Sequence, residues 1–311
     1  MSSPSAPMTT VAGTVAILGR PNVGKSTLLN ALVGEKLAIV TPKPQTTRNR
    51  IVGVANGPWG QIVFVDTPGV HGSRKALNRF MVQEALGTIE SVDAALLVVD
   101  AGERRPGNEE KEILRELKAA RRPTVLVLNK VDRVKDKGAL LPILADWEQV
   151  AKFEALVPIS ALRNKNLAPV VSELVKLLPH GEPQYGPDML TDRTERFLAA
   201  ELVREQIFLL TRQELPYAVA VDIESWEERA PKAGAGDATD VVIRATILVE
   251  RDTQKAIVVG KGGAMIREIG MKARAGVTEL LGRPAHLMLE VKVEPEWTTS
   301  PEALARLGYR P

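Results

Sequence analysis

A run of eight residues near the start of the chain has the pattern of a loop that binds phosphate. Gly19-Arg20-Pro21-Asn22-Val23-Gly24-Lys25-Ser26 fits G-x-x-x-x-G-K-[ST]. The apolar run 14–18 precedes it and a helix-compatible pattern follows, which is the strand–loop–helix context that gives the pattern meaning. In such a loop, glycines allow successive N–H groups to face phosphate oxygens, and the next helix adds the positive end of its dipole.

Several side chains in and beyond this loop could hold a nucleotide and a metal ion. Lys25 can reach β- and γ-phosphates, and the Ser26 hydroxyl can bind Mg²⁺. Asp66 ends an apolar run, where a carboxylate linked to Mg²⁺ is expected. Gly69, in Asp66-Thr67-Pro68-Gly69, would offer its N–H to a γ-phosphate at a spot with no room for a side chain. In the polar segment 41–50 we expect Thr47 to bind Mg²⁺, with adjacent Thr46 as the alternative.

Apolar runs that alternate with helix-like stretches predict the scaffold of this site. They indicate an α/β fold whose doubly wound, mostly parallel sheet is covered on both faces. The runs are a strand pair at 51–54 and 61–65, buried strands at 94–99, 125–128 and 156–159, and helix-like stretches at 77–90 and 109–118. Asn129-Lys130-Val131-Asp132 and Ser160-Ala161-Leu162 follow the last two strands, and open α/β sheets bind ligands at such carboxyl ends.

Composition limits the classes of protein to consider. The 311 residues suffice for about two domains, and the absence of cysteine excludes disulfides and thiolate catalysis. With three histidines, a metal site built on histidine is not expected. The pI of about 9.0 suggests a nucleic-acid partner only if the positive charge is clustered. We interpret residues 1–10, rich in serine and proline, as a disordered tail, and no run is apolar enough to span a membrane.

The second half of the chain has the pattern of a smaller α+β domain. A stretch at 178–188 rich in proline and glycine predicts an interdomain linker, and helical periodicity resumes at Thr194. Strand-like runs at 217–223 and 241–249 flank a flexible loop expected at 230–240. Helical stretches then surround Gly260-Lys261-Gly262-Gly263, and an alternating strand follows at 286–293.

The pattern G-x-x-G at Gly260-Lys261-Gly262-Gly263 is typical of the loop by which a KH domain clamps single-stranded nucleic acid. Lys261 adds charge toward phosphate, and Ile257, Val258 and Ile266 could line a groove for bases. Basic residues gather around the loop: Arg251, Lys255, Lys261, Arg267, Lys272 and Arg274. A turn between two helices and a solvated basic face are the plainer alternatives. The order helix–strand–strand–helix–loop–helix–strand favours the KH interpretation and is similar to the type II arrangement.

The polar motifs of the first half, taken in order, resemble the five sequence boxes of a translation-factor-class GTPase. The resemblance implies that Asp132 accepts two hydrogen bonds from guanine, that Asn129 holds the base and the loop, and that the Ala161 N–H meets the guanine oxygen. Adenine would leave the acceptors of Asp132 unpaired, which gives large discrimination. The full set expected to contact GTP or GDP is residues 19–27 (Thr27 included), Asp66, Thr67, Pro68, Gly69, Val70, Asn129, Lys130, Asp132, Ser160, Ala161 and Leu162.

The catalytic arrangement departs from that of Ras-like enzymes at one position. Val70 stands where those enzymes have the glutamine that orients the attacking water, so slow intrinsic hydrolysis is expected. In related GTPases with asparagine at the position of Asn22, a potassium ion can supply positive charge between the phosphates; the alternative is that Asn22 only stabilises its loop. Lys25, Thr47, Gly69 and Asn22 form the predicted catalytic set, and His71 is interpreted as a solvated loop residue.

Both halves together resemble the Era family. The resemblance rests on the loop 19–26, on Gln45-Thr46-Thr47-Arg48, on Leu190-Thr191-Asp192-Arg193 leading into a KH domain, and on Trp297 and Leu307-Gly308-Tyr309. It implies a bacterial GTPase that binds the 3′ region of small-subunit ribosomal RNA during small-subunit assembly. We expect the protein to be cytoplasmic and monomeric. A peripheral membrane association also belongs to the family, although no residue here indicates it. The expected divisions are a tail (1–10), a GTPase domain (11–178), a linker (179–193), a KH domain (194–296) and a C-terminal tail (297–311).

Three hypotheses for function follow from these patterns. In the first, GTP orders residues 41–50 and 66–73, hydrolysis releases them, and RNA access to the KH domain changes with that state. In the second, the protein is an RNA-binding assembly module whose nucleotide site is a slow timer or purely structural. In the third, a GTPase regulates membrane-bound partners and its second domain binds protein.

Overall fold

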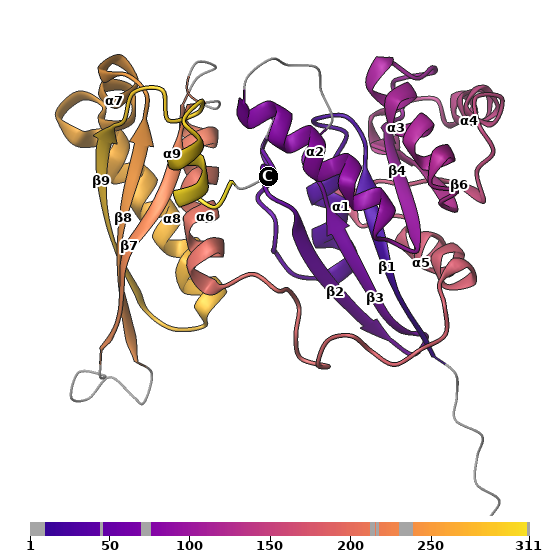
Figure 1. Cartoon of the computed structure of the whole chain (residues 1–311), viewed down its shortest axis with the longest axis horizontal. Helices are drawn as coiled ribbons and strands as arrows, with labels where there is room; N and C mark the ends of the chain where they lie inside the picture. Colours follow the sequence, from indigo (N-terminus) through magenta and orange to yellow (C-terminus); the bar gives the residue numbers. More distant parts are fainter. Residues whose placement is uncertain are drawn as a thin grey trace, which may run out of the picture. The chain divides into compact units, whose positions relative to one another are not determined.

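The computed structural model describes residues 10–43, 46–69, 76–211, 215, 218–229 and 239–309, with only the backbone of residues 76–81. These residues form two compact units, and Figure 1 labels most of their elements. One unit comprises the described parts of Met1–Leu37, Thr47–Gly72 and Met81–Asp192. The other comprises those of Ala38–Thr46, Ser73–Phe80 and Arg193–Pro311. The short segment Ala38–Thr46 therefore groups with the C-terminal half, which the sequence did not predict.

The first unit is built on a six-stranded sheet in the order β2-β3-β1-β4-β5-β6. Only β2 runs antiparallel to its neighbour; the other neighbouring strands are parallel. The apolar runs that predicted these strands are almost wholly buried, as expected for a sheet covered on both faces. The strands are β1 (Val11–Leu18), β2 (Ile51–Gly57), β3 (Gly60–Asp66), β4 (Ala94–Asp100), β5 (Thr124–Asn129) and β6 (Ala155–Pro158).

Helices cover this sheet and complete the doubly wound fold, which confirms the predicted fold class. The helices are α1 (Lys25–Val33), α2 (Ala76–Glu90), α3 (Asn108–Ala119), α4 (Leu140–Glu148) and α5 (Leu167–Leu177). Residues of α2, α3 and α4 share one core cluster with alternate residues of β1, β4 and β5, among them Ile113, Trp147 and Leu97. On β1, Ala16 and Leu18 belong to that cluster, so Val15 and Ile17 point to the opposite face, because side chains alternate along a strand.

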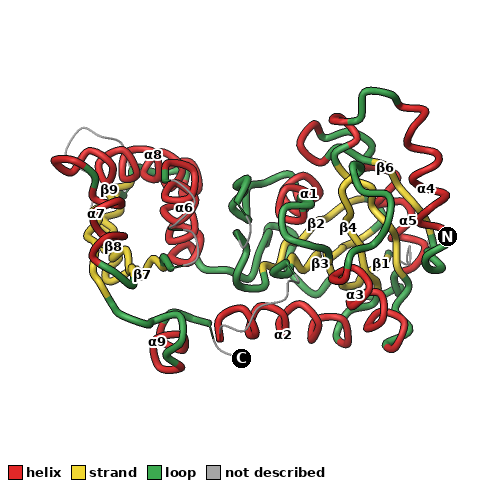
Figure 2. The backbone as a smooth tube through the Cα atoms, turned by 90° about the horizontal axis from the view of Figure 1, so that it is seen from above, coloured by secondary structure: helices red, strands yellow, loops and turns green. Residues whose placement is uncertain are grey.

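The second unit has the element order predicted for a type II KH domain. Its sheet has the order β7-β8-β9, with β7 antiparallel and β9 parallel to β8, and Figure 2 shows α6 and α8 beside it. Val203 and Ile207 of α6 pack with Ile269 and Ala273 of α8 in its core. The elements are α6 (Glu195–Leu210), β7 (Ala220–Arg229), β8 (Asp240–Val249), α7 (Asp252–Val259), α8 (Ala264–Leu281), β9 (Ala285–Val293) and α9 (Pro301–Arg306).

Three expectations from the sequence concern the strand at 217–223, the loop at 230–240 and the C-terminal tail at 297–311. The strand predicted at 217–223 lies instead at Ala220–Arg229, because pairing with β8 continues through polar residues that carry no apolar signal. Most of the loop expected at 230–240 falls outside the described residues. Trp297 is fully buried, its indole N–H donates to the Ala218 carbonyl (3.1 Å), and its ring stacks on Tyr309. Residues beyond β9 therefore pack against the unit.

The stretch after α5 is irregular, as its proline and glycine content predicted, yet it is hydrogen-bonded to the first sheet. The buried Gln61 side chain accepts from the N–H groups of Gln184 (2.8 Å) and Tyr185 (2.9 Å) and donates to the Tyr185 carbonyl (2.9 Å). Further on, the Val54 N–H donates to the Leu190 carbonyl (2.8 Å). The segment is thus fixed to β2 and β3 by specific hydrogen bonds.

Among the helices of the described residues, none has both the length and the apolar character that crossing a membrane requires.

Candidate nucleotide site and nucleic-acid loop

The loop between β1 and α1 requires glycine at both ends of its motif. Gly19 has φ +146° and Gly24 has φ +99°, which side-chain-bearing residues rarely adopt. A β-carbon at Gly19 would lie 2.4 Å from the Val98 carbonyl oxygen, and one at Gly24 would lie 2.4 Å from the Asn129 amide nitrogen. The loop is therefore closely packed against β4 and against the residue that ends β5.

Lys25, the first residue of α1, is buried beneath this loop. Its ammonium donates to the carbonyl oxygens of Gly19 and Arg20, both at 3.0 Å. Burial lowers the pKa of Lys25 to about 8, although the Asp66 carboxylate opposes this shift. The chain thus holds a cation where phosphate oxygens cradled by the loop would be close to it.

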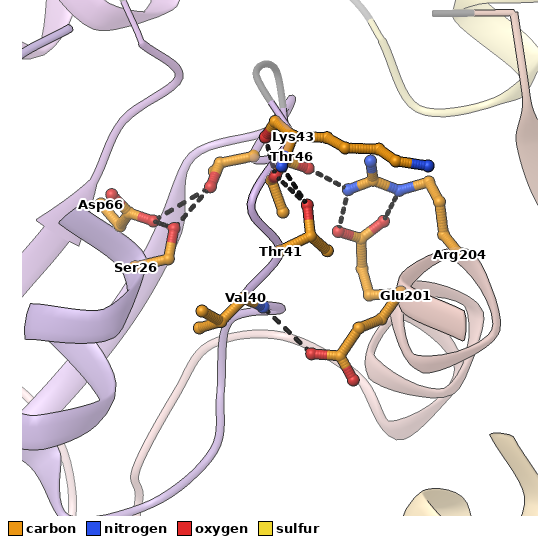
Figure 3. Close-up of polar contacts among 10 residues, drawn as sticks. Ser26, Val40, Thr41, Lys43, Thr46, Asp66, Glu201 and Arg204 are labelled. Atoms are coloured by element: carbon orange, nitrogen blue, oxygen red, sulfur yellow. Dashed lines mark hydrogen bonds and ion pairs between the residues drawn. The ribbon is translucent and has the colours of Figure 1, made fainter. Parts of the chain in front are cut away.

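Three oxygen-bearing side chains converge at the end of β3. The Ser26 hydroxyl lies 2.6 Å from Asp66 Oδ2 (Figure 3). It also lies 2.7 Å from the Thr47 hydroxyl, which is itself 3.3 Å from Asp66 Oδ2. Burial raises the pKa of Asp66 to about 6, while Lys25 and the hydrogen bonds from Ser26 and Thr47 act in the opposite direction. The adjacent Thr46 hydroxyl bonds instead to the Lys43 carbonyl (2.7 Å) and to Thr41 (2.8 Å). Thr47, not Thr46, therefore contributes its hydroxyl to this cluster.

The donor set of this cluster suits Mg²⁺. It consists only of hydroxyl and carboxylate oxygens, which hard divalent cations prefer. Asp66 Oδ1 is buried and, within the part of the chain that the structure describes, has no hydrogen-bond partner. A buried carboxylate oxygen without a partner is costly unless an ion or a donor binds it.

The loop after β3 approaches the phosphate loop very closely. A β-carbon at Gly69 would lie 2.7 Å from the Pro21 nitrogen and 2.9 Å from the Pro21 α-carbon. These are backbone atoms, so the contact leaves no room for a side chain. The Thr67 hydroxyl anchors the loop by donating to the Ile17 carbonyl of β1 (2.9 Å). Val70 and His71 lie outside the described residues.

The ends of β5 and β6 form a second polar group at the same edge of the sheet. The Asn129 side chain donates to the Val23 carbonyl (2.8 Å) and accepts from the N–H groups of Lys130 (2.8 Å) and Ala161 (3.0 Å). Ser160 donates to Asp132 at 2.5 Å, and this hydrogen bond is the chief cause that lowers the pKa of Asp132. Asp132 and Leu162 are exposed. An ionised carboxylate is thus presented to solvent next to a fixed amide.

Acidic residues that support the phosphate loop were not found by sequence reasoning. The Arg20 guanidinium pairs with Glu103 and with the fully buried Glu110, so its side chain is engaged in two ion pairs within the protein. Lys130 pairs with Asp100 at 2.8 Å and donates to the Asn22 carbonyl at 2.5 Å. These acids belong to β4, α3 and the loop between them, and no motif marks them. Asp100 ends a buried strand beside the known motifs, and that position is the one signal that could have identified it.

The G-x-x-G loop joins α7 to α8 as predicted, with one correction. Gly260, Gly262 and Gly263 have φ of +70°, +60° and +77°, and no atom of the described residues, apart from the immediate chain neighbours, lies within 4 Å of a β-carbon added at Gly262 or Gly263. Lys261 and Arg267 are exposed, as is Ile257. The expectation that Val258 lines a groove for bases is wrong, because Val258 is completely buried in the core.

Comparisons with known proteins match both halves of the chain. Residues 14–130 match the model of a family described as 50S ribosome-binding GTPase, and residues 214–298 match that of the KH domain. GTPase Era of Xanthomonas oryzae pv. oryzae (strain MAFF 311018) is 50% identical over 298 residues, which is 96% of each chain. GTPase Era of Geobacter metallireducens is 47% identical over 297 residues, or 96% of this chain and 97% of the relative.

Two solved structures are similar over nearly the whole chain. One is a variant of Aquifex aeolicus Era bound to GDP·AlF4⁻, and the other is Era in complex with MgGDPNP and nucleotides 1506–1542 of 16S ribosomal RNA. Each has a TM-score of 0.91 and 40% identity, and each match covers 97% of this chain and 100% of the other. The fold, the motifs and the relatives agree, and the chain belongs to the Era family of GTPases.

Proposed function

We propose that the protein is a GTP-hydrolysing switch that binds the 3′ region of small-subunit ribosomal RNA through its KH domain and acts in small-subunit assembly. The observation that carries this proposal is the match, over 97% of the chain, to Era in complex with MgGDPNP and a 16S ribosomal RNA fragment. It is supported by a chain that keeps, in one molecule, the G-x-x-x-x-G-K-[ST] loop and the G-x-x-G loop. As a partner of ribosomal RNA it would act in the cytoplasm, and we propose that it does so as a monomer.

In this proposal the nucleotide binds along the carboxyl edge of the first sheet. The phosphates lie in the loop 19–26 and the first turn of α1, which includes Thr27. Asp132 binds the guanine edge, Asn129 and Lys130 support the base, and residues 160–162 enclose it. What supports the role of Asn129 is its set of hydrogen bonds, which link the phosphate loop at Val23 to the backbone of Ala161.

We propose Ser26, Thr47 and Asp66 as the protein ligands of Mg²⁺. The convergence of their oxygens and the unpartnered Oδ1 of Asp66 support this set. When bound, the ion would neutralise charge on the β- and γ-phosphate oxygens. Thr47 comes from the segment that precedes β2, so its hydroxyl can bind Mg²⁺ only when that segment is correctly positioned.

For the chemical step we assign Lys25 and Gly69 to the γ-phosphate, and Asn22 to the charge that builds up between the phosphates. Lys25 supplies a buried ammonium, and Gly69 supplies an N–H at a point that excludes side chains. Asn22 has φ +64°, which holds the loop in a left-handed turn at that residue. We propose that a potassium ion acts beside Asn22; the alternative is that Asn22 serves only this turn.

The first experiment measures GTP hydrolysis with and without single-stranded RNA from the 3′ end of small-subunit ribosomal RNA, in potassium and in sodium buffer. We expect RNA to stimulate hydrolysis in potassium and less so in sodium. Equal rates in both buffers would remove the potassium role of Asn22. Tight RNA binding with negligible turnover under every condition would favour an RNA-binding assembly module over a switch.

A second experiment tests the RNA role of the G-x-x-G loop. Lys261→Glu and Gly262→Asp introduce negative charge where phosphate is expected, so RNA affinity should fall at least about tenfold, which corresponds to ~1.4 kcal/mol. Hydrolysis without RNA should not change. Lys118→Glu, at an exposed position of α3, alters net charge by as much as Lys261→Glu does and should leave RNA affinity unchanged. Loss of affinity in the control alone, or in none of the variants, would argue against a KH role.

A further inference from the structure

The segment Ala38–Thr46, which leads to the proposed Mg²⁺ ligand Thr47, is held by α6 and the residue after it. The Val40 N–H donates to Glu205 (3.0 Å), and the Lys43 ammonium donates to the Thr211 carbonyl. At the end of the segment, Arg204 Nη2 donates to the Thr46 carbonyl oxygen at 2.5 Å (Figure 3). These contacts lie within one compact unit, which contains both the segment and the KH domain.

The Arg204 guanidinium is held in one orientation by its neighbours. The side chain is 1% exposed, and its guanidinium forms a bidentate ion pair with the Glu201 carboxylate, in which Nε donates to Oε1 at 2.7 Å and Nη2 donates to Oε2. The guanidinium also lies over the Phe208 ring, 5.1 Å from its centroid. Burial acts to lower the pKa of Arg204, and Glu201 more than offsets it, so the pKa is raised and the group stays charged. A paired, buried guanidinium has little rotational freedom, so the N–H groups that do not face Glu201 point in a fixed direction.

The bond from Arg204 acts on the peptide group that begins Thr47. The Thr46 carbonyl, the Thr47 nitrogen and the Thr47 α-carbon lie in one plane, because the peptide bond does not rotate freely. Holding the carbonyl oxygen therefore fixes the plane from which the Thr47 side chain projects. That side chain places its hydroxyl 2.7 Å from Ser26 Oγ and 3.3 Å from Asp66 Oδ2.

We propose that Arg204, in the first helix of the KH domain, is a positioning residue for GTP hydrolysis that acts through the Thr46 carbonyl on Thr47. This inference rests on the proposed function, because that function assigns Thr47 its role as a Mg²⁺ ligand. Among the described residues, Arg204 makes hydrogen bonds to Glu201 and to the Thr46 carbonyl and to none of the three proposed Mg²⁺ ligands. It sets how firmly Thr47 stands beside Ser26 and Asp66, and the KH domain thereby contributes a residue on which the GTPase site depends.

The test compares Arg204→Gln with Arg204→Lys and with Arg196→Gln, an exposed arginine of the same helix. The first readout is the gain in affinity for the non-hydrolysable GppNHp when Mg²⁺ replaces EDTA, and the second is kcat for GTP. A hydrogen bond to a charged group contributes about 1.5 to 3 kcal/mol, so Arg204→Gln should reduce both by about tenfold to a hundredfold. GDP affinity in EDTA and the behaviour of Arg196→Gln should match the wild type.

Arg204→Gln leaves Glu201 buried without its partner, so this variant can lose folded protein. Arg204→Lys keeps the charge but not the planar fork, and it should fold and show an intermediate loss. A cycle with Thr47→Ala gives the sharpest readout: if Arg204 acts through Thr47, replacing it in a Thr47→Ala background should change neither the Mg²⁺-dependent affinity nor kcat by more than about twofold.

Two outcomes would overturn the inference. One is full additivity of the Arg204 and Thr47 substitutions, and the other is a wild-type Mg²⁺-dependent gain in folded Arg204→Gln and Arg204→Lys. Failure of the proposed function looks different: the wild-type protein would bind GppNHp but would not hydrolyse GTP, while the affinity readout would still decide the role of Arg204.

Discussion

Gly69 shows how a single residue brings two loops of the site together. A β-carbon there would lie under 3 Å from two backbone atoms of Pro21, which cannot move aside as a side-chain end can. We expect Gly69→Ala to lower GppNHp affinity at least about tenfold, or ~1.4 kcal/mol, because the added methyl separates the loop after β3 from the phosphate loop. GDP affinity should fall less. Titration with fluorescent GppNHp and GDP measures both.

The matched control for this change is Gly87→Ala. Gly87 is exposed in α2, and within the part of the chain that the structure describes no atom lies within 4 Å of a β-carbon built on it, apart from its own helix and chain neighbours. Alanine should be neutral there or slightly stabilising, since glycine is the poorer helix residue by about 1 kcal/mol. If Gly69→Ala weakened GppNHp and GDP binding equally, the close approach would not be specific to the γ-phosphate side.

Asp66 and Lys25 make the stability of the protein free of nucleotide and Mg²⁺ depend on pH. Burial raises the pKa of Asp66 from 3.8 to about 6, so the folded state keeps a proton that the unfolded chain loses, and stability falls as pH rises from 3.8 to 6. Burial lowers the pKa of Lys25 from 10.5 to about 8, so stability recovers between pH 8 and 10.5. These two groups should therefore cost the fold most between pH 6 and 8.

The double variant Lys25→Met/Asp66→Asn removes both charges at similar side-chain volume. Without ligand, its Tm should exceed that of the wild type most between pH 6 and 8, and the difference should shrink toward pH 4 and toward pH 10, since only the wild type titrates there. Thermal unfolding across this range measures the difference. A difference that stays constant with pH would show that neither pKa is shifted by burial.

At the scale of elements, the sequence correctly predicted the strands and the motifs at their ends, because local residue patterns encode both. Apolar runs predicted the strands because a sheet covered on both faces buries every side chain, and motifs after those runs met because parallel strands end at one edge. Ile257 and Val258 show the limit of this reasoning. Both are apolar neighbours in a helix, where consecutive side chains point about 100° apart, so only Ile257 remains exposed. Arg204 and Glu110 belong to no motif, and only tertiary contacts reveal their roles.

The stretch after α5 gives an element-scale prediction. The buried Gln61 side chain makes hydrogen bonds with both polar backbone groups of Tyr185 and with Gln184, and Tyr185 packs on Val52, Val54, Val63 and Val65. Gln61→Leu keeps the volume and leaves these backbone groups without partners. We expect the free energy of unfolding of the first unit to fall by about 1 to 3 kcal/mol, because three hydrogen bonds of about 0.5 to 1.5 kcal/mol each are lost while water can reach the backbone of the exposed Gln184 and the half-exposed Tyr185.

Urea unfolding and limited proteolysis between residues 179 and 192 measure this effect. Gln83→Leu, at an exposed position of α2, is the control and should change neither the unfolding midpoint nor the cleavage rate. If Gln61→Leu unfolded at the wild-type midpoint and resisted protease equally, the segment would be held by Tyr185 packing alone.

At the scale of the whole molecule, the chain enters the second unit long before the KH domain begins. It passes from the first unit to the second between Leu37 and Ala38 and returns between Thr46 and Thr47. Thr47, the first residue after the return, contributes its hydroxyl to the proposed Mg²⁺ site. The carbonyl of Thr46, the residue before it, accepts a hydrogen bond from Arg204 of α6. Helix α6 packs on α8 through the core of the second unit, and α8 begins at the G-x-x-G loop. One continuous set of packed elements therefore joins the proposed RNA loop to Thr46.

This continuity predicts how RNA stimulation should respond to Arg204→Gln. RNA can alter hydrolysis only by as much free energy as its binding distinguishes between two arrangements of the elements that reach the site. If α6 is that route, Arg204→Gln should abolish most of the RNA-stimulated increment, while RNA affinity stays within about twofold because the loop 260–263 is untouched. Hydrolysis at saturating RNA and direct RNA binding separate the two effects, and Arg196→Gln should keep the full increment. A folded Arg204→Gln variant with normal stimulation would mean that the RNA signal reaches the nucleotide without passing through Thr46, even if Arg204 still positions Thr47 in the absence of RNA.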